Sequence, residues 1–128
     1  ISKKKMLREL DKLDGRITAK NKYLNEKVEV DGIKFQSTKE ANYYLFLKQL
    51  QKEGEVKSIE LQPKYELLPA FEKNGKKYRA ITYTADFKVT YSDGRVEVID
   101  TKGYQTQAFR LKHKLFEHKY PDLTLKIV

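Results

Sequence analysis

Two aspartates and a lysine in the C-terminal half of the chain have the residue types and spacing for metal-assisted phosphate chemistry. Asp86 precedes the triplet Asp100-Thr101-Lys102, in which a carboxylate and an ammonium group lie two positions apart. Carboxylate oxygens suit a hard cation such as Mg²⁺, whose remaining positions stay open to water and to a substrate phosphate. A lysine beside such a cation could neutralise charge on the phosphate, orient the attacking water or act as a base. The pattern favours a nucleic-acid phosphodiesterase, although in a chain that is 35% charged it also fits a surface strand with a loose salt bridge.

Composition limits the kinds of metal and compartment that fit the chain. The 128 residues are enough for one domain with a real core. There is no cysteine and there are only two histidines, which argues against disulfides, thiolate metal sites and a zinc enzyme. No apolar run approaches the ~20 residues of a membrane span, and the lysine-rich start lacks a signal-peptide core. We therefore expect a cytoplasmic protein without a membrane partner, in which carboxylates hold any metal.

The net charge of +9 is concentrated at the two ends of the chain. Residues 1–30 carry nine Lys and Arg against five Asp and Glu, and residues 102–128 carry six against two. Basic flanks around an acidic centre are expected of an enzyme that grips phosphates and binds metal between them. A solvated lysine-rich surface explains the same charges.

Hydrophobic periodicity and turn residues predict one α/β (α+β) domain, residues 28–128, preceded by an N-terminal helix and basic arm, residues 1–27. Ser37-Thr38-Lys39-Glu40 is a capping box, and the helix that it opens should bury Ala41, Tyr44, Leu45, Leu47 and Leu50. The remaining predictions are a hairpin over 28–35, strands over 59–67, 78–91 and 95–101, a helix over 106–120 with Ala108, Leu111, Leu115 and Phe116 inward, and a last strand over 123–128. Pro63 indicates an edge position or a bulge in the first long strand.

The loop Ser92-Asp93-Gly94 decides whether the two aspartates meet, because pairing register fixes which side chains share a face. A two-residue Asp93-Gly94 turn would put Asp86 and Asp100 on opposite faces unless a β-bulge intervened near Asp86. A three-residue loop with a left-handed Gly94 pairs residues whose numbers sum to 186, so that Asp86 lies opposite Asp100. By either route we expect the two carboxylates to converge, with Lys102 on the face of Asp100.

The order of these elements and acids resembles the PD-(D/E)XK nuclease superfamily, the restriction-endonuclease-like fold. The resemblance runs from about Asn21 to Val128. The stretches NKYLNEKVEVDGIKFQSTKEANYY, LQPKYELLPAF, YRAITYTADF and VIDTKG are similar to those of small phage and prophage proteins of that superfamily, some of them resolvase-like. Two departures stand out: Ala85 replaces the proline of the motif, and the second acid is Asp rather than Glu. The resemblance implies an αβββαβ core with a central mixed sheet flanked by helices.

The resemblance also implies a role for each matching residue. Asp86 and Asp100 would ligate Mg²⁺, for which Mn²⁺ can substitute, together with the backbone carbonyl of Thr101. Lys102 would be the catalytic lysine, and Glu40 an outer metal ligand, although the capping box explains Glu40 equally well. The implied activity is Mg²⁺-dependent endonucleolytic hydrolysis of DNA.

Further candidates lie around this cluster and extend it toward the substrate. Gln62 and Gln105 are candidates for positions next to the site, and each fits an ordinary solvent-facing residue. Residues that could contact DNA phosphates are Lys88, Arg110, Lys112 and Lys114. With no motif for reading base sequence, we expect structure-directed cutting of branched or recombining DNA, as by a Holliday junction resolvase, in the host cytoplasm of a phage or prophage. A homodimer would suit such a substrate. The rival interpretations are a non-catalytic nucleic-acid-binding protein with this fold and a phage interaction or assembly protein.

Overall fold

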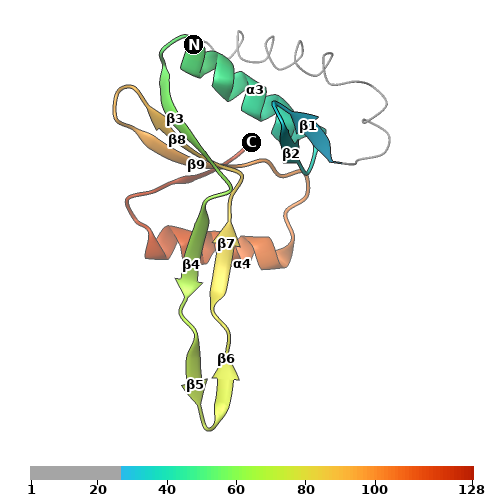
Figure 1. The fold of residues 1–128 in the computed structure, drawn as a ribbon. Coiled ribbons are helices and arrows are strands. Elements are labelled where there is room, and N and C mark those ends of the chain that lie inside the picture. The colour runs from blue at the N-terminus through green and yellow to red at the C-terminus, as the bar shows by residue number, and fades with distance from the viewer. Residues whose placement is uncertain (1–26) are drawn as a thin grey trace. The chain divides into compact units, whose positions relative to one another are not determined.

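The computed structural model describes residues 27–128, which fall into a unit ending at Lys57 and a second unit, Ser58–Val128 (Figure 1). The helix and basic arm predicted within residues 1–27 lie, except for Lys27, outside the described residues. The predicted α+β class is confirmed: helices and a mixed sheet are both present. No helix in the described part of the chain is long and apolar enough to cross a membrane.

The first unit contains a small hairpin and one helix. Strands β1 (Val28–Val30) and β2 (Ile33–Phe35) pair through a turn in which Asp31 and Gly32 both have positive φ. Helix α3 (Thr38–Lys52) begins at Ser37, whose side chain accepts a hydrogen bond from the Glu40 amide at 3.1 Å. The helix was predicted from this capping box, and of its predicted inward residues all but the half-buried Leu45 are fully buried.

The second unit is built around a sheet in the order β10-β9-β8-β3. Its strands and the helix that follows β9 are β3 (Val56–Leu61), β8 (Phe87–Tyr91), β9 (Val96–Asp100), α4 (Gln107–Lys119) and β10 (Leu125–Ile127). The first two residues of β3 belong to the first unit. Strand β9 pairs antiparallel with β8 and parallel with β10, so the sheet is mixed. With α3 before β3, the core elements follow in the predicted order αβββαβ.

Two long strands expected from the sequence are interrupted at the same level. The strand predicted over 59–67 is divided into β3 and β4 (Lys64–Leu68) by Gln62 and Pro63, and Gln62 has a φ of 49°. The strand predicted over 78–91 is likewise divided into β6 (Lys76–Tyr78), β7 (Ile81–Thr84) and β8. Prediction of continuous strands was wrong at these positions, but the irregularity expected at Pro63 is present.

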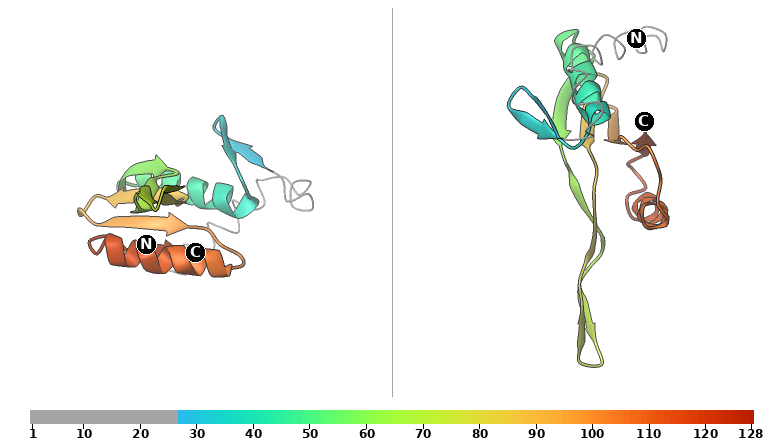
Figure 2. Two further views of the ribbon diagram at one scale, coloured as in Figure 1. Left: turned by 90° about the horizontal axis from the view of Figure 1, so that it is seen from below. Right: turned by 90° about the vertical axis from the view of Figure 1, so that its right-hand side faces the viewer.

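The interruptions face one another across the ribbon. The amide of Gln62 donates to the carbonyl of Asp86 at 2.9 Å, and the amide of Ala85 donates to the carbonyl of Pro63 at 3.0 Å. Beyond this point β4 pairs with β7, and β5 (Phe71–Lys73) pairs with β6 as a hairpin. The β5–β6 hairpin projects away from β8, β9 and α4, as two directions of view agree (Figures 1 and 2).

Helix α4 covers one face of the second unit and closes its core. Thr106 caps its start, with the Phe109 amide donating to the Thr106 side chain at 3.1 Å. Phe109 and Phe116 are its buried residues. They belong to an apolar cluster that also contains Tyr65, Leu67, Tyr83, Ala85, Val98 and Leu125. Ala108 and Leu111 were predicted to face inward, and this prediction was wrong, since both are exposed. The apolar stripe that α4 turns toward the strands is narrower than expected.

Candidate active site

The β8–β9 hairpin has the register in which paired residue numbers sum to 186. Phe87 lies opposite Ile99, and the three-residue loop between the strands ends at Gly94, whose φ is 94°. The Gly94 amide donates to the carbonyl of Tyr91 at 3.0 Å, and the Tyr91 amide donates to the carbonyl of Arg95 at 2.8 Å. This is the predicted three-residue alternative, and it brings the backbone of Asp86 to the level of Asp100.

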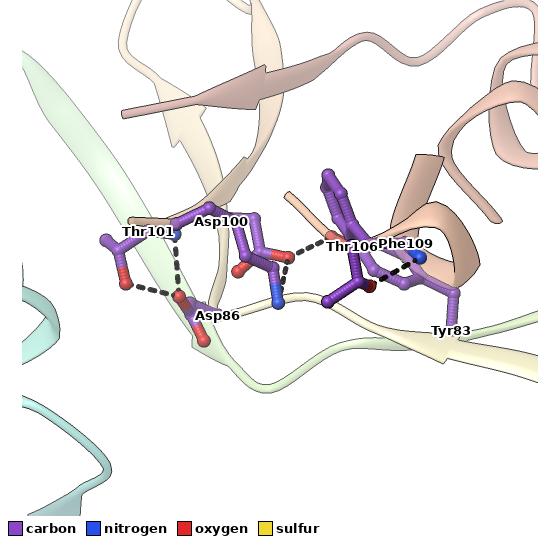
Figure 3. Close-up of polar contacts among 7 residues, drawn as sticks. Tyr83, Asp86, Asp100, Thr101, Thr106 and Phe109 are labelled. Atoms are coloured by element: carbon purple, nitrogen blue, oxygen red, sulfur yellow. Dashed lines mark hydrogen bonds and ion pairs between the residues drawn. The ribbon is translucent and has the colours of Figure 1, made fainter. Parts of the chain in front are cut away.

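Asp86 lies where β8 and β9 separate. Beyond this point the side chain of Asp86, and not its backbone, makes the hydrogen bonds to the residue that follows β9. Its amide donates to the carbonyl of Ile99 at 3.1 Å, the residue already paired with Phe87, so the ladder shifts by one residue here. If the same register continued, Ala85 would pair with Thr101, but its amide donates to the carbonyl of Pro63 instead. The Asp86 carboxylate therefore receives the Thr101 amide at 2.7 Å and the Thr101 hydroxyl at 2.6 Å, both on Oδ2 (Figure 3).

Asp100 is a buried carboxyl group, only 2% exposed, at the end of β9. Its Oδ2 accepts a hydrogen bond from the Tyr83 hydroxyl and lies 3.6 Å from Nζ of Lys102. Burial raises the pKa of Asp100 to about 7, and a hydrogen bond with the Asp86 carboxyl and its negative charge act in the same direction. The Tyr83 hydroxyl and the Lys102 charge oppose this rise. The two carboxyls are thus close enough to compete for one proton.

Lys102 is held between a charge and an aromatic ring. Its Nζ lies 3.6 Å from the Asp100 carboxylate and 4.8 Å from the centroid of the Phe109 ring on α4. About a third of its side chain remains exposed, at 34%. The ammonium group is therefore positioned by the protein and still open to a solvent-side ligand.

The backbone that carries Asp100 and Lys102 is fixed by the last strand. Ile127 pairs with Asp100 in β10, and the Val128 amide donates to the carbonyl of Asp100 at 3.0 Å. The amide of Lys102 donates to the carbonyl of Val128 at 3.3 Å. The side chains of Asp100 and Lys102 thus project from a backbone that is hydrogen-bonded to the last segment of the chain, which is the kind of support a preorganised site needs.

Glu40 lies on α3 in the first unit. It is 3% exposed, and its Oε2 accepts a 3.4 Å hydrogen bond from the amide of Gln36, the residue before the helix cap Ser37. The contacts described for Glu40 are therefore those of a helix start.

The other sequence candidates take varied positions in the second unit. Gln62 is exposed and bonds the backbone of Asp86 rather than its carboxylate. Gln105 is half-buried just before the cap of α4, and Lys88 is half-buried on β8 opposite Val98. Of the α4 candidates, Arg110 and Lys114 are exposed and Lys112 is half-buried.

Asp86 and Asp100 are the carboxylates of this cluster that could serve as oxygen ligands of a metal. Within residues 27–128, no three His, Cys, Asp or Glu side chains are grouped closely enough to hold a metal by themselves. The contacts of Asp86 with Thr101, and those of Asp100 with Tyr83 and Lys102, are all made through Oδ2. Two mutually repelling carboxylates with a nearby backbone turn fit Mg²⁺, which is usually bound by one or two carboxylates, water and substrate phosphate. The Thr101 contacts described here involve its amide and hydroxyl, and the carbonyl predicted to join the metal takes no part in them.

Two further residues contact this cluster and were not among the predicted site residues. Tyr83 is buried, with 4% of its surface exposed, and its hydroxyl donates to Asp100. Burial and this hydrogen bond raise the pKa of Tyr83 and keep it protonated. Phe109, which supports Lys102, lacked any signal beyond the apolar stripe of α4, seven positions further along the chain.

Fold and site together define an α+β protein with an acidic pair and a lysine at the end of a β-hairpin. The chain belongs to the family described as "Protein of unknown function (DUF1064)", which matches residues 20–128. No curated protein and no solved structure matches the chain.

Proposed function

We propose that this protein is a metal-dependent endonuclease of the PD-(D/E)XK superfamily that hydrolyses phosphodiester bonds in DNA. The observation that carries the proposal is the meeting of Asp86, Asp100 and Lys102, which lie at the start of β8 and the end of β9 and are linked by side-chain contacts. The αβββαβ order, expected from the resemblance, supports the same conclusion.

The acidic pair would hold the cation, Mg²⁺ or Mn²⁺, with Thr101 contributing its carbonyl. A cation bound there would polarise the scissile phosphate and lower the pKa of a water molecule. The ionised form of Asp100 would be stabilised most by such a cation. A positive charge would offset both the cost of burial and the repulsion from Asp86, the two effects that raise the pKa of Asp100. Tyr83 would hold the Asp100 carboxylate in a fixed orientation by its hydroxyl.

Lys102 would act on the substrate rather than on the cation. Its ammonium is held by Asp100 and the face of Phe109, with a third of the side chain exposed. In that position it can donate to a phosphate oxygen, stabilise the negative charge that grows there, or orient the attacking water. Removal of such a group costs about 10²–10³-fold in rate in comparable sites.

The substrate that we propose is branched or recombining DNA in a phage or prophage setting, cut in the host cytoplasm. The net charge of +9 supports a phosphate-rich partner, and α4 adds the exposed basic residues Arg110 and Lys114 beyond the site. A homodimer would allow paired cuts in a junction.

Cleavage assays test the enzyme proposal directly. The protein is incubated with plasmid, single-stranded and four-way-junction DNA in Mg²⁺, Mn²⁺ or EDTA, beside Asp86→Ala, Lys102→Ala and the surface control Lys126→Ala. We expect cutting by wild type and Lys126→Ala only with metal, and a loss of about 10²-fold or more in the other two variants. If wild type binds DNA but cuts none of these substrates, the protein is a non-catalytic binder. Cutting that survives Lys102→Ala would remove that residue from the mechanism.

A further inference from the structure

The β5–β6 hairpin is an exposed basic and aromatic projection that the candidate active site does not use. Every residue from 71 to 79 is exposed, and this stretch, FEKNGKKYR, holds four basic residues and one acidic residue. The hairpin extends beyond β4 and β7, away from β8, β9 and α4 (Figure 2). Burial in the core does not explain why this exposed hairpin is formed, and an isolated hairpin is only marginally stable in water.

The pairing register sorts these side chains onto two faces. Phe71 lies opposite Tyr78 and Lys73 lies opposite Lys76, and since alternate residues share a face, these four side chains lie on the same one. The opposite face carries the pair Glu72 and Lys77. One face of the hairpin therefore carries two aromatic and two cationic side chains and no acidic one, whereas the other face contains the acidic residue.

The aromatic–cationic face is organised, not merely exposed. The rings of Phe71 and Tyr78 stack with centroids 4.6 Å apart and planes 7° from parallel, while remaining 44% and 39% exposed as residues. Nζ of Lys76 lies 5.0 Å from the centroid of the Tyr78 ring. Asn74 and Gly75 form a tight turn with φ values of 53° and 77°, which fixes the two lysines at the tip.

We infer that the β5–β6 hairpin binds double-helical DNA, with its aromatic–cationic face toward a groove and its lysines on the flanking phosphates. The major groove, about 12 Å wide, admits a two-stranded β-ribbon. Cationic side chains on both strands of the ribbon meet the two phosphate chains that border a groove. The inference rests on the proposed function for the identity of the partner, but the surface is separate from the carboxylate site and can be tested without cleavage.

Binding in EDTA tests the hairpin without any chemistry. Fluorescence anisotropy of labelled duplex and single-stranded DNA is measured across a salt series for wild type and for the triple variant Lys73→Gln, Lys76→Gln and Lys77→Gln. The matched control removes three exposed lysines from α3 and β3, Lys48→Gln, Lys52→Gln and Lys57→Gln, and so makes the same change in net charge. The double variant Phe71→Ala and Tyr78→Ala tests the aromatic pair.

We expect the hairpin triple variant to bind duplex about 10-fold or more weakly than the control, with a salt slope lower by about 2–3. The aromatic variant should weaken binding without lowering the slope. Equal binding by the hairpin and control variants, or no duplex binding by wild type, would overturn the inference, and hairpin-dependent preference for single strands would overturn the groove assignment. Binding through the hairpin without cleavage in any metal would overturn only the nuclease proposal.

Discussion

Replacing Asp100 by asparagine should stabilise the metal-free protein above neutral pH. The substitution keeps the size of the side chain and removes an ionisable group that is 2% exposed. In the folded protein, burial and the neighbouring Asp86 raise the pKa of Asp100 from 3.8 to about 7. The folded state therefore holds this proton more tightly than the unfolded chain does.

The sign and size of the effect follow from that difference. The stability contributed by protonated Asp100 is fully present below its unfolded pKa and is lost as pH rises through about 7. At about 1.36 kcal/mol per pKa unit, ionised Asp100 costs at most about 4 kcal/mol at pH 8. Asparagine removes this cost, but Tyr83 and Lys102 bond an amide less strongly than a carboxylate. A net gain of about 1–2 kcal/mol remains, which corresponds to several degrees in Tm for a domain of this size.

Thermal and urea unfolding in EDTA at pH 8 and pH 5 measures this gain. Asp100→Asn should unfold later than wild type at pH 8, and the difference should shrink or reverse at pH 5, where wild-type Asp100 is protonated. Asp122→Asn, at an exposed position, is the matched control and should change neither value by more than about 0.5 kcal/mol. The reasoning is refuted if Asp100→Asn destabilises at pH 8, or if its gain is equal at both pH values.

Three further predictions concern the same cluster and the hairpin that forms it. Millimolar Mn²⁺ should raise the Tm of wild type at pH 8 and leave Asp100→Asn unchanged in differential scanning fluorimetry; equal shifts would place the cation elsewhere. Tyr83→Phe removes the hydroxyl that donates to the buried Asp100 carboxylate and leaves Lys102 as its charged neighbour. Urea unfolding at pH 8 should show a loss of about 1–3 kcal/mol in the free energy of unfolding, and no loss would show that the hydroxyl is dispensable. Gly94→Ala forces a side chain into a φ of 94° and should cost about 1 kcal/mol or more in the free energy of unfolding, whereas Gly103→Ala, at a glycine outside the left-handed region with open space around it, should cost less; similar losses would contradict a role for the left-handed glycine.

Much of the site was predictable because it depends on short-range pairing rules. Gly94, placed three residues after Tyr91, offered one register that would bring Asp86 to Asp100, and that register is the observed one. The sequence did not reveal how the Asp86 carboxylate comes to bond Thr101. The Ala85 amide donates to Pro63, which is distant in the sequence, and the Thr101 amide is therefore left to bond the carboxylate of Asp86. Long-range pairing of this kind leaves no periodic signal in either segment.

The hairpin beyond β4 and β7 was missed for a related reason. Asn74-Gly75 is a strong turn signal, but the residues beside it, such as Lys73, Lys76 and Lys77, lack the apolar–polar alternation of a half-buried strand. Only Phe71 and Tyr78 mark a pair, and the sequence does not show that they lie opposite each other. The hydrogen bond from Tyr83 to Asp100 was likewise missed, because it depends on how two separate strands pack.

The facing interruptions at Gln62-Pro63 and Ala85-Asp86 separate the projecting ribbon from the strands that hold the carboxylate site. On one side of them the ribbon runs through β4 and β7 to the β5–β6 tip, and on the other side β8 begins directly after Asp86 and enters the sheet. Adding or removing equal numbers of residues on each side of Asn74-Gly75 would change the length of the ribbon and leave every hydrogen bond at Asp86 in place. A tip can thus be exchanged between chains of this architecture as a module, while the carboxylates and Lys102 keep their positions.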